Sequence, residues 1–201
     1  MNVWLHALVR TEDGRHATAH LREDALARIG ASVDGVWSGA TGFGLRSDEA
    51  VVLLRCSDDA SAGAAVEALR APTDVVEVQG TPLHELAAPE PPQAPDRDAG
   101  GFWVFRHFDV AADDLPRFRE LSVSAWPTFQ TATGARVERL FRGPERPDGS
   151  LLVLLLTWYP DLATWEGSRA PEADPEGHAR FAERRALTRH TRAVALRAVA
   201  T

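Results

Sequence analysis

The chain has 201 residues, of which 29 are acidic and 22 basic, and its formal net charge of -7 argues against a broad nucleic-acid-binding or anionic-membrane surface. With 44% hydrophobic residues, a chain of this length can bury a core without disulfides. Cys56 is the only cysteine, which excludes an intramolecular disulfide and a cysteine-cluster zinc site. The 22 basic side chains are all arginine, so lysine Schiff-base chemistry is excluded as well.

No segment predicts export or membrane insertion. The N-terminal residues lack the apolar run of a signal peptide. The longest apolar run, Leu151 to Leu156, is far shorter than the roughly 18 residues that cross a bilayer. Together with the single cysteine, this predicts a soluble cytoplasmic protein with no membrane partner.

The first half of the chain alternates strand-like and helix-like patterns. It opens with NVWLHALVRT, whose aromatic and β-branched residues are typical of a strand. The patterns predict strands at about 2–10, 34–46, 49–56 and 74–80, and helices at about 13–30 and 60–70.

A proline-rich segment follows. Residues 87–100, AAPEPPQAPDRDAG, carry four prolines that disfavour a helix and favour an extended linker. We therefore expect a first domain at 1–86, a linker at 87–100 and a second domain at 101–201.

The second half has stronger signals. GFWVFRHFDV, at 101–110, predicts a strand, and Asp113 or Asp114 can cap a helix that ends near Pro127 or continues to Gly134. ARVERLFRG and SLLVLLLTWY predict a hairpin. A helix starting near Leu162, interrupted by APEADPEG, resumes through HARFAERRALTRH and precedes a strand, RAVALRAV.

The predicted order is βαββαβ in each half. The predicted fold class is therefore α+β, with two tandem ferredoxin-like halves and antiparallel sheets. Each half has helices on one sheet face, so the opposite face needs a cover, which either the other half or a second copy in a homodimer can supply.

Two stretches in the second half resemble a known family. TWYPDLATWEGSR, followed by ADPEGHARFAERRALT, is similar to NIPSNAP domains and, more loosely, to antibiotic-biosynthesis-monooxygenase domains, both of the dimeric α/β-barrel superfamily. VFRHFDVAADDLPRF is similar to the opening strand and helix of NIPSNAP domains. The resemblance covers roughly residues 102–199.

The resemblance implies a dimeric α/β-barrel-type architecture with a cleft that holds a small hydrophobic or aromatic ligand. It leaves open whether the protein is an enzyme, because fold is a poor guide to chemistry. Some relatives degrade haem with a tryptophan and a helical histidine, a region where this chain has Trp165 and His178. Haem is therefore a possible cofactor, although the spacing between these two residues is longer here; otherwise no cofactor is expected.

The strand at 101–110 carries the candidate catalytic residues. Alternation places Trp103, Phe105 and His107 on one face and Arg106 on the other. His107 would titrate near neutrality and act as a general acid or base, and Arg106 would hold a carboxylate or phenolate oxygen. The alternative is a hydrogen-bonded structural histidine and an ion-paired arginine. Trp103 and Phe105 are candidate ligand contacts.

Other aromatic residues and histidines are further candidates for ligand binding. Trp4 and His6 share a strand face in the first half, while Trp158 and Trp165 flank a strand-to-helix corner. Packing is the alternative role for each, because aromatic side chains also dominate cores.

Two further histidine patterns are worth testing. His16 and His20 have the spacing of two metal ligands on one helix face, but two ligands do not make a site and we expect no metal. His178 and His190 lie in the predicted last helix among Arg180, Arg184, Arg185 and Arg189, a positive stripe that could receive an acidic ligand or pair with acidic neighbours.

Three functions remain open from the sequence. The first is a NIPSNAP-like protein that binds a small hydrophobic or aromatic molecule. The second is a cofactor-independent monooxygenase or cyclase-like enzyme of aromatic or polyketide metabolism, which stabilises an anionic intermediate. The third is a haem-binding or haem-degrading protein, for which His107 or His178 would supply the axial ligand.

Overall fold

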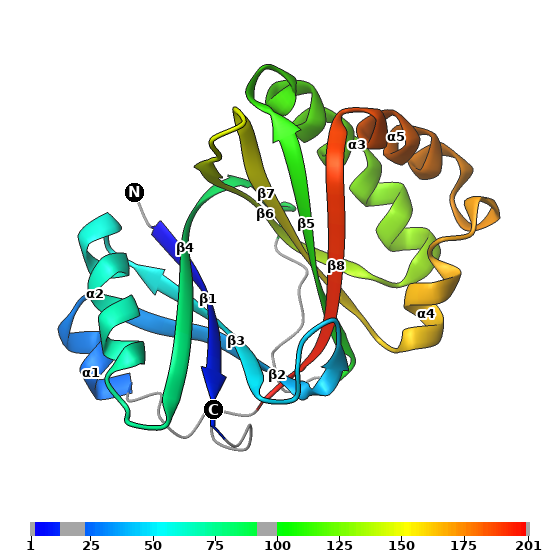
Figure 1. Cartoon of the computed structure of the whole chain (residues 1–201). Helices are drawn as coiled ribbons and strands as arrows, with labels where there is room; N and C mark the ends of the chain where they lie inside the picture. Colours follow the sequence, from blue (N-terminus) through cyan, green and yellow to red (C-terminus); the bar gives the residue numbers. More distant parts are fainter. Residues whose placement is uncertain (1–2, 13–22, 92–99, 200–201) are drawn as a thin grey trace. The chain divides into compact units, whose positions relative to one another are not determined.

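The computed structural model describes residues 3–12, 23–91 and 100–199 (Figure 1). The chain divides into two compact units. Unit 1 comprises Met1–His84 and Val194–Thr201, and unit 2 comprises Glu85–Ala193.

Unit 1 is an antiparallel sheet with two helices. Its elements are β1 (Val3–Thr11), α1 (Glu23–Arg28), β2 (Ala31–Phe43), β3 (Glu49–Cys56), α2 (Asp59–Arg70) and β4 (Val75–Ala87), whose last residues fall in unit 2. β1 pairs with β3 and β4, and β2 pairs with β3. The last residues of β8 also pair with β2.

The core of unit 1 lies between its sheet and its helices. Alternate residues of β1, namely Val3, Leu5, Ala7 and Val9, belong to one buried apolar cluster together with residues of α1, α2, β2 and β3. From Val3 to Val9 this face of β1 is therefore apolar, as period-two alternation requires for a strand with one covered face.

Unit 2 repeats this order of strands and helices, with a longer first helix and an additional short helix before its last one. Its elements are β5 (Phe102–Ala111), α3 (Leu115–Thr133), β6 (Arg136–Glu145), β7 (Ser150–Tyr159), α4 (Leu162–Gly167), α5 (Pro175–Ala186) and β8 (Thr188–Ala198), whose end falls in unit 1. β7 is central and pairs antiparallel with both β5 and β6. In Figure 1, α3 and α5 run beside each other on one side of these strands.

The α+β class, the antiparallel pairing and the order βαββαβ in each half are confirmed. The helix expected from Asp113 or Asp114 does continue past Pro127, and it ends at Gly134, whose φ of 73° is the left-handed conformation that suits glycine. The last helix is shorter than predicted. Because α5 ends at Ala186 and β8 begins at Thr188, the expectation that His190 lies in a helix is wrong.

Some expectations lie outside the described residues. Most of the predicted helix at 13–30 does so, including His16 and His20, and so does most of the proline-rich segment. Among the residues that are described, no group of three or more potential metal ligands occurs. Within the same residues, no helix has the length and apolarity of a membrane span.

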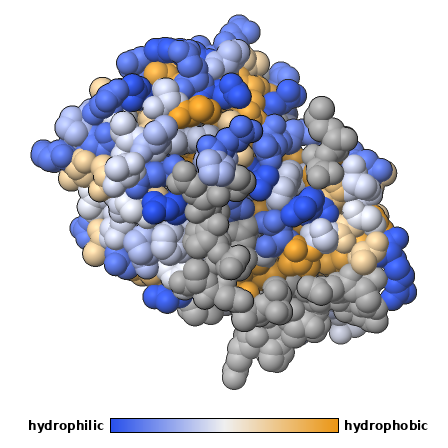
Figure 2. All heavy atoms as spheres, turned by 180° about the vertical axis from the view of Figure 1, so that it is seen from behind, coloured by the Kyte–Doolittle hydropathy of each residue, from blue (hydrophilic) through white to orange (hydrophobic). Residues whose placement is uncertain are grey.

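The surface is largely polar on the face seen from behind. Hydrophilic residues dominate this view, and hydrophobic ones form smaller patches between them (Figure 2). Phe43 and Val76 are the large apolar side chains that stay exposed among the described residues.

Candidate functional site

Unit 2 contains a cavity of about 500 Å³ on the helix-covered side of its strands. Its walls come from β5, β6, β7, α3 and α5, from the start of β8 and from the segment after α4. Aromatic and aliphatic side chains form much of the lining: Val104, Phe108, Trp126, Phe129, Val137, Leu155, Tyr159 and Phe181. This size and apolarity are those of a small-molecule site.

Strand alternation explains which residues of the sheet reach the cavity. Side chains directly opposite each other on paired strands share a face, and Arg106 pairs with Leu155 while Val104 pairs with Thr157. Val137 of β6 in turn pairs with Thr157. All five residues line the cavity, so one face of the sheet supplies its floor.

Helix α5 supplies the opposite wall through residues spaced three and four apart. His178, Phe181 and Arg185 are lining residues, as is Arg184, one turn beyond Phe181. The helix is fixed at its start by the buried Asp174, whose carboxylate caps it by accepting from the backbone NH of Gly177 at 3.0 Å and accepts from Thr128 of α3 at 3.1 Å.

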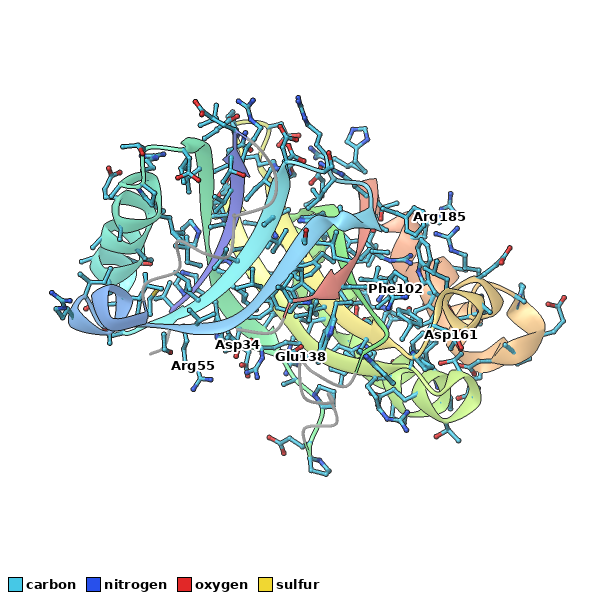
Figure 3. The ribbon with its side chains drawn as sticks, turned by 90° about the horizontal axis from the view of Figure 1, so that it is seen from below. Asp34, Arg55, Phe102, Glu138, Asp161 and Arg185 are labelled. Carbon is cyan, nitrogen blue, oxygen red and sulfur yellow. The ribbon has the colours of Figure 1, made fainter. Side chains whose placement is uncertain are left out.

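The charge of the cavity is one-sided. Among the described residues, four arginines line it, Arg106, Arg169, Arg184 and Arg185, and no aspartate or glutamate does. Arg185 projects from α5 in Figure 3. The excess of positive charge is notable because acidic residues outnumber arginines in the chain as a whole.

Arg184 is the most buried of these arginines, with 6% of its surface exposed. Its guanidinium donates to the hydroxyl of Ser122 at 3.2 Å and lies over the rings of Phe108, Phe118 and Phe181 at 5.0, 5.4 and 4.7 Å. Burial, followed by the positive charge of Arg106, lowers the pKa of Arg184 to about 9. The side chain is therefore still charged at neutral pH.

Arg106 and Tyr159 lie close enough to influence each other's ionisation. Burial is the main reason that the pKa of Arg106 lies below its ordinary value, with Arg169 adding to the effect. Burial likewise raises the pKa of the Tyr159 hydroxyl, although the neighbouring arginines oppose this. Tyr159 is thus a neutral phenol at physiological pH and can donate a hydrogen bond into the cavity.

His178 lines the cavity from α5. Its Nε2 lies 3.0 Å from the carbonyl oxygen of Ser168. A carbonyl only accepts, so Nε2 carries the proton and donates it to this bond. The bond ties α5 to the segment that follows α4.

The other residues predicted on β5 lie on the opposite face of the strand. His107, Trp103 and Phe105 are not among the lining residues of this cavity, and the cavity therefore brings Arg106 and His178 together without them. Burial, followed by the charges of Arg192 and Arg146, lowers the pKa of His107 to about 4. The expectation that His107 titrates near neutrality is therefore wrong.

The remaining candidates also lie outside the cavity lining. Trp158 pairs with Trp103 across β7 and β5, and its indole donates to the carbonyl of Gly100 at 2.8 Å. Trp165 stacks under the guanidinium of Arg169 at 4.7 Å. Their assignment to ligand binding stays a prediction.

The two candidates of the first half belong to unit 1. Trp4 and His6 lie on the face of β1 opposite the apolar cluster. The guanidinium of Arg55 lies 5.4 Å from the Trp4 ring centre and also 3.6 Å from the carboxylate of Asp34; both labelled residues appear in Figure 3. Ligand binding by Trp4 and His6 also stays a prediction.

Several lining residues were not singled out as site residues from the sequence. Tyr159, Trp126 and Phe129 look like ordinary core positions in a strand and a helix. Arg184 carried a usable signal, since an arginine three residues after the apolar Phe181 falls on the face of a helix that packs inward.

The positive stripe predicted for the last helix separates into two groups. Arg180 forms an ion pair with Glu176, and Arg189 of β8 forms one with Asp148 at 3.3 Å. Arg184 and Arg185 instead line the cavity. Arg180 and Arg189 thus pair with acidic neighbours, whereas the receipt of an acidic ligand by Arg184 and Arg185 stays a prediction.

The lining residues fit a haem poorly. His178 is the one histidine among them, and ligation through its Nε2 would require its bond to Ser168 to break. Tyr159 is held neutral by burial, whereas haem iron takes a tyrosine as its phenolate. His107 lies on the other face of β5.

Comparison with known proteins gives structural but no sequence relatives. No family model matches the chain, and no curated protein matches its sequence. Solved structures do match over nearly the whole chain. A candidate monooxygenase from Lactobacillus acidophilus NCFM has a TM-score of 0.61 at 11% identity, covering 97% of this chain and 92% of that one.

Two further structures show the breadth of the match. An anthrone oxidase-like protein has a TM-score of 0.59 at 13% identity, covering 99% of this chain and 92% of that one. A variant of DypB from Rhodococcus jostii RHA1, solved in complex with haem, has a TM-score of 0.54 at 8% identity, covering 97% and 93%. At these identities the likeness shows the fold alone, an α+β fold with antiparallel strands.

Proposed function

We propose that unit 2 binds a small, largely apolar molecule with an aromatic part in the cavity between its strands and α3 and α5. The observation that carries this proposal is the cavity itself, about 500 Å³ in volume, with aromatic and aliphatic side chains from the strands and both helices in its lining. A closely packed core leaves few voids of this size.

The proposal also assigns different roles to the two halves of the chain. The segments 1–86 and 101–201, joined by 87–100, are tandem ferredoxin-like copies in which the second keeps the ligand site. The matching strands support this, because β1 presents only apolar residues to its helices whereas β5 presents Arg106 between Val104 and Phe108. The proposal also includes a NIPSNAP-like identity, based on the resemblance of residues 102–199, and a homodimer, based on the sheet face that needs a cover.

A pair of variants tests the binding site. Ala182 of α5 lines the cavity and Ala179 of the same helix does not. Ala182 is exposed at the rim of the cavity, so Ala182→Trp places an indole where it can obstruct the cavity, and Ala179→Trp adds the same side chain elsewhere on the helix. In a ligand-observed NMR screen of aromatic compounds, we expect binding to be lost only in Ala182→Trp. Equal binding by both variants would place the ligand elsewhere.

A second candidate function is a cofactor-independent monooxygenase. The observation that favours it is the shielded pair of Arg106 and Tyr159, which can stabilise an enolate or phenolate oxygen next to apolar walls. The structural likeness to an anthrone oxidase-like protein suggests the assay. Anthrone and dioxygen would give anthraquinone and water, with the methylene carbon oxidised to a ketone.

This reaction is followed by the absorbance of anthraquinone in air-saturated buffer. Enzymatic turnover would exceed the buffer rate and fall in Arg106→Met and Tyr159→Phe. A rate equal to that of buffer alone would leave anthrone oxidation unsupported while the binding proposal stands. Titration with haemin tests whether the cavity binds haem. A Soret shift in the unmodified protein that is abolished in Ala182→Trp would support haem binding in the cavity.

A further inference from the structure

The ligand class can be narrowed from the charges of the cavity, provided that the proposed binding site is correct. The lining holds four arginines and no carboxylate, in a chain with more acidic than basic residues. Two of the four, Arg106 and Arg184, are the ones whose pKa burial lowers. A buried cation without a counter-charge is unfavourable, so its retention calls for an anion.

Arg184 differs from Arg180 of the same helix in its partners. Arg180 forms an ion pair with Glu176, four residues earlier. Among the described residues, Arg184 forms no ion pair, and its one side-chain hydrogen bond goes to the neutral hydroxyl of Ser122. A guanidinium has five N–H donors, so most of its hydrogen-bonding capacity is available to a molecule in the cavity.

The residues around Arg184 hold its side chain in place without neutralising its charge. Three phenylalanine rings surround its guanidinium, and such cation–π contacts position a cation while leaving its edge free to donate. Ser122 also donates to the carbonyl of Phe118 at 2.7 Å, so this hydroxyl is fixed in orientation and offers its lone pair to Arg184. The side chain is therefore preorganised.

Arg106 reaches the same cavity from the sheet, with Tyr159 beside it. The charges of Arg106 and Arg184 affect each other, which places the two guanidiniums within electrostatic reach. Among the described residues, Arg106 also has no ion pair. Two guanidiniums and the O–H of a neutral phenol supply N–H and O–H donors, which match the lone pairs of one planar oxyanion.

We propose that Arg106, Arg184 and Tyr159 form a carboxylate subsite, and that the ligand is an aromatic carboxylic acid bound with its carboxylate toward these residues. The ring of the ligand packs on Phe129, Trp126 and Leu155. A carboxylate suits the site because the planar fork of arginine matches its two oxygens, and because one negative charge on an apolar body suits a lining that combines arginines with aromatic and aliphatic side chains.

The first test uses the unmodified protein. Isothermal titration calorimetry compares 2-naphthoate with 2-naphthamide, which has nearly the same shape and no charge. We expect the acid to bind at least about 10-fold more tightly than the amide. Equal affinities would refute the carboxylate subsite and leave the cavity as a site for neutral molecules. Absence of binding by both, and by the benzoate and anthracene-2-carboxylate pairs, would count against the proposed function as well.

The second test removes one charge at a time. Arg184→Met and Arg106→Met should each weaken 2-naphthoate binding roughly 100-fold and change 2-naphthamide binding by less than about 3-fold. Arg180→Met is the matched control, since this arginine lies on the same helix as Arg184 and outside the cavity lining. Loss of both probes in parallel would assign the two arginines a structural role and overturn the proposal.

A third probe separates the carboxylate from a larger anion. If 2-naphthyl phosphate binds more tightly than 2-naphthoate and shows the same losses in both variants, the subsite is for phosphate and the carboxylate assignment is wrong. Weaker binding of the phosphate supports the carboxylate. Arg184→Lys adds a geometric check, because a lysine keeps the charge but not the planar fork, and it should recover only part of the affinity.

Discussion

The buried histidine on β5 predicts a measurable acid sensitivity. The pKa of His107 is lowered from 6.5 to about 4, chiefly by burial and then by the charges of Arg192 and Arg146, with Asp109 acting in the opposite direction. Between these two pKa values the unfolded chain takes up a proton at this position and the folded protein does not. Stability from this group is therefore complete above pH 6.5 and is lost as the pH falls toward 4.

The size of the effect follows from the two pKa values. At about 1.4 kcal/mol per pKa unit, the full difference between 6.5 and about 4 corresponds to about 3 kcal/mol. Over the experimentally convenient range from pH 7.5 to pH 5, the same two values give a loss of about 2 kcal/mol. This is a large share of the stability of an ordinary domain.

Urea unfolding followed by tryptophan fluorescence measures this loss. The unmodified protein and His107→Gln are compared at steps of half a pH unit from pH 7.5 to pH 5. Carboxylates titrate in both proteins, so their contribution to the free energy of unfolding cancels when the two proteins are subtracted. We expect the free energy of unfolding to fall by about 2 kcal/mol more in the unmodified protein. Parallel pH profiles would show that His107 is not held neutral and would refute the argument from burial.

Four further substitutions test other parts of the structure by urea unfolding. Asp174→Ala should lower the free energy of unfolding by about 2–3 kcal/mol, because it removes a helix cap and a buried hydrogen bond, whereas Thr128→Val should cost about 1 kcal/mol; equal losses would contradict the capping role. Leu54→Ala in the apolar cluster of unit 1 should cost about 3 kcal/mol without changing probe affinity in the cavity. Trp158→Phe loses one hydrogen bond, so a cost of about 1 kcal/mol and unchanged affinity are expected; a fall in affinity would return Trp158 to the site.

Local sequence patterns were sufficient for the elements of the second half. The apolar stripe from Leu115 to Trp126 predicted α3, and turn residues between two apolar runs predicted the hairpin of β6 and β7. The end of α5 was misplaced because the segment LTRH has no proline or glycine to stop a helix, and pairing of β8 in the sheet decides the boundary instead.

The sequence could separate the two faces of β5 but could not identify the face that borders the cavity. Alternation alone puts Arg106 and His107 on opposite sides. The choice between them depends on where α3 and α5 pack, which is a tertiary property. The helices cover the side of Arg106, so this residue meets the cavity and His107 does not.

The sequence by itself determined the α+β class, the repeated order of elements and the presence of an arginine-rich last helix. These features follow from the periodicity of apolar residues and from local composition, which can be recognised within a few neighbouring residues. The tertiary structure alone decided that Arg184 is buried without a carboxylate and that Arg106, from a strand 78 positions earlier in the chain, reaches the same cavity. Such contacts depend on packing between elements that are distant in the sequence, so no local sequence pattern predicts them.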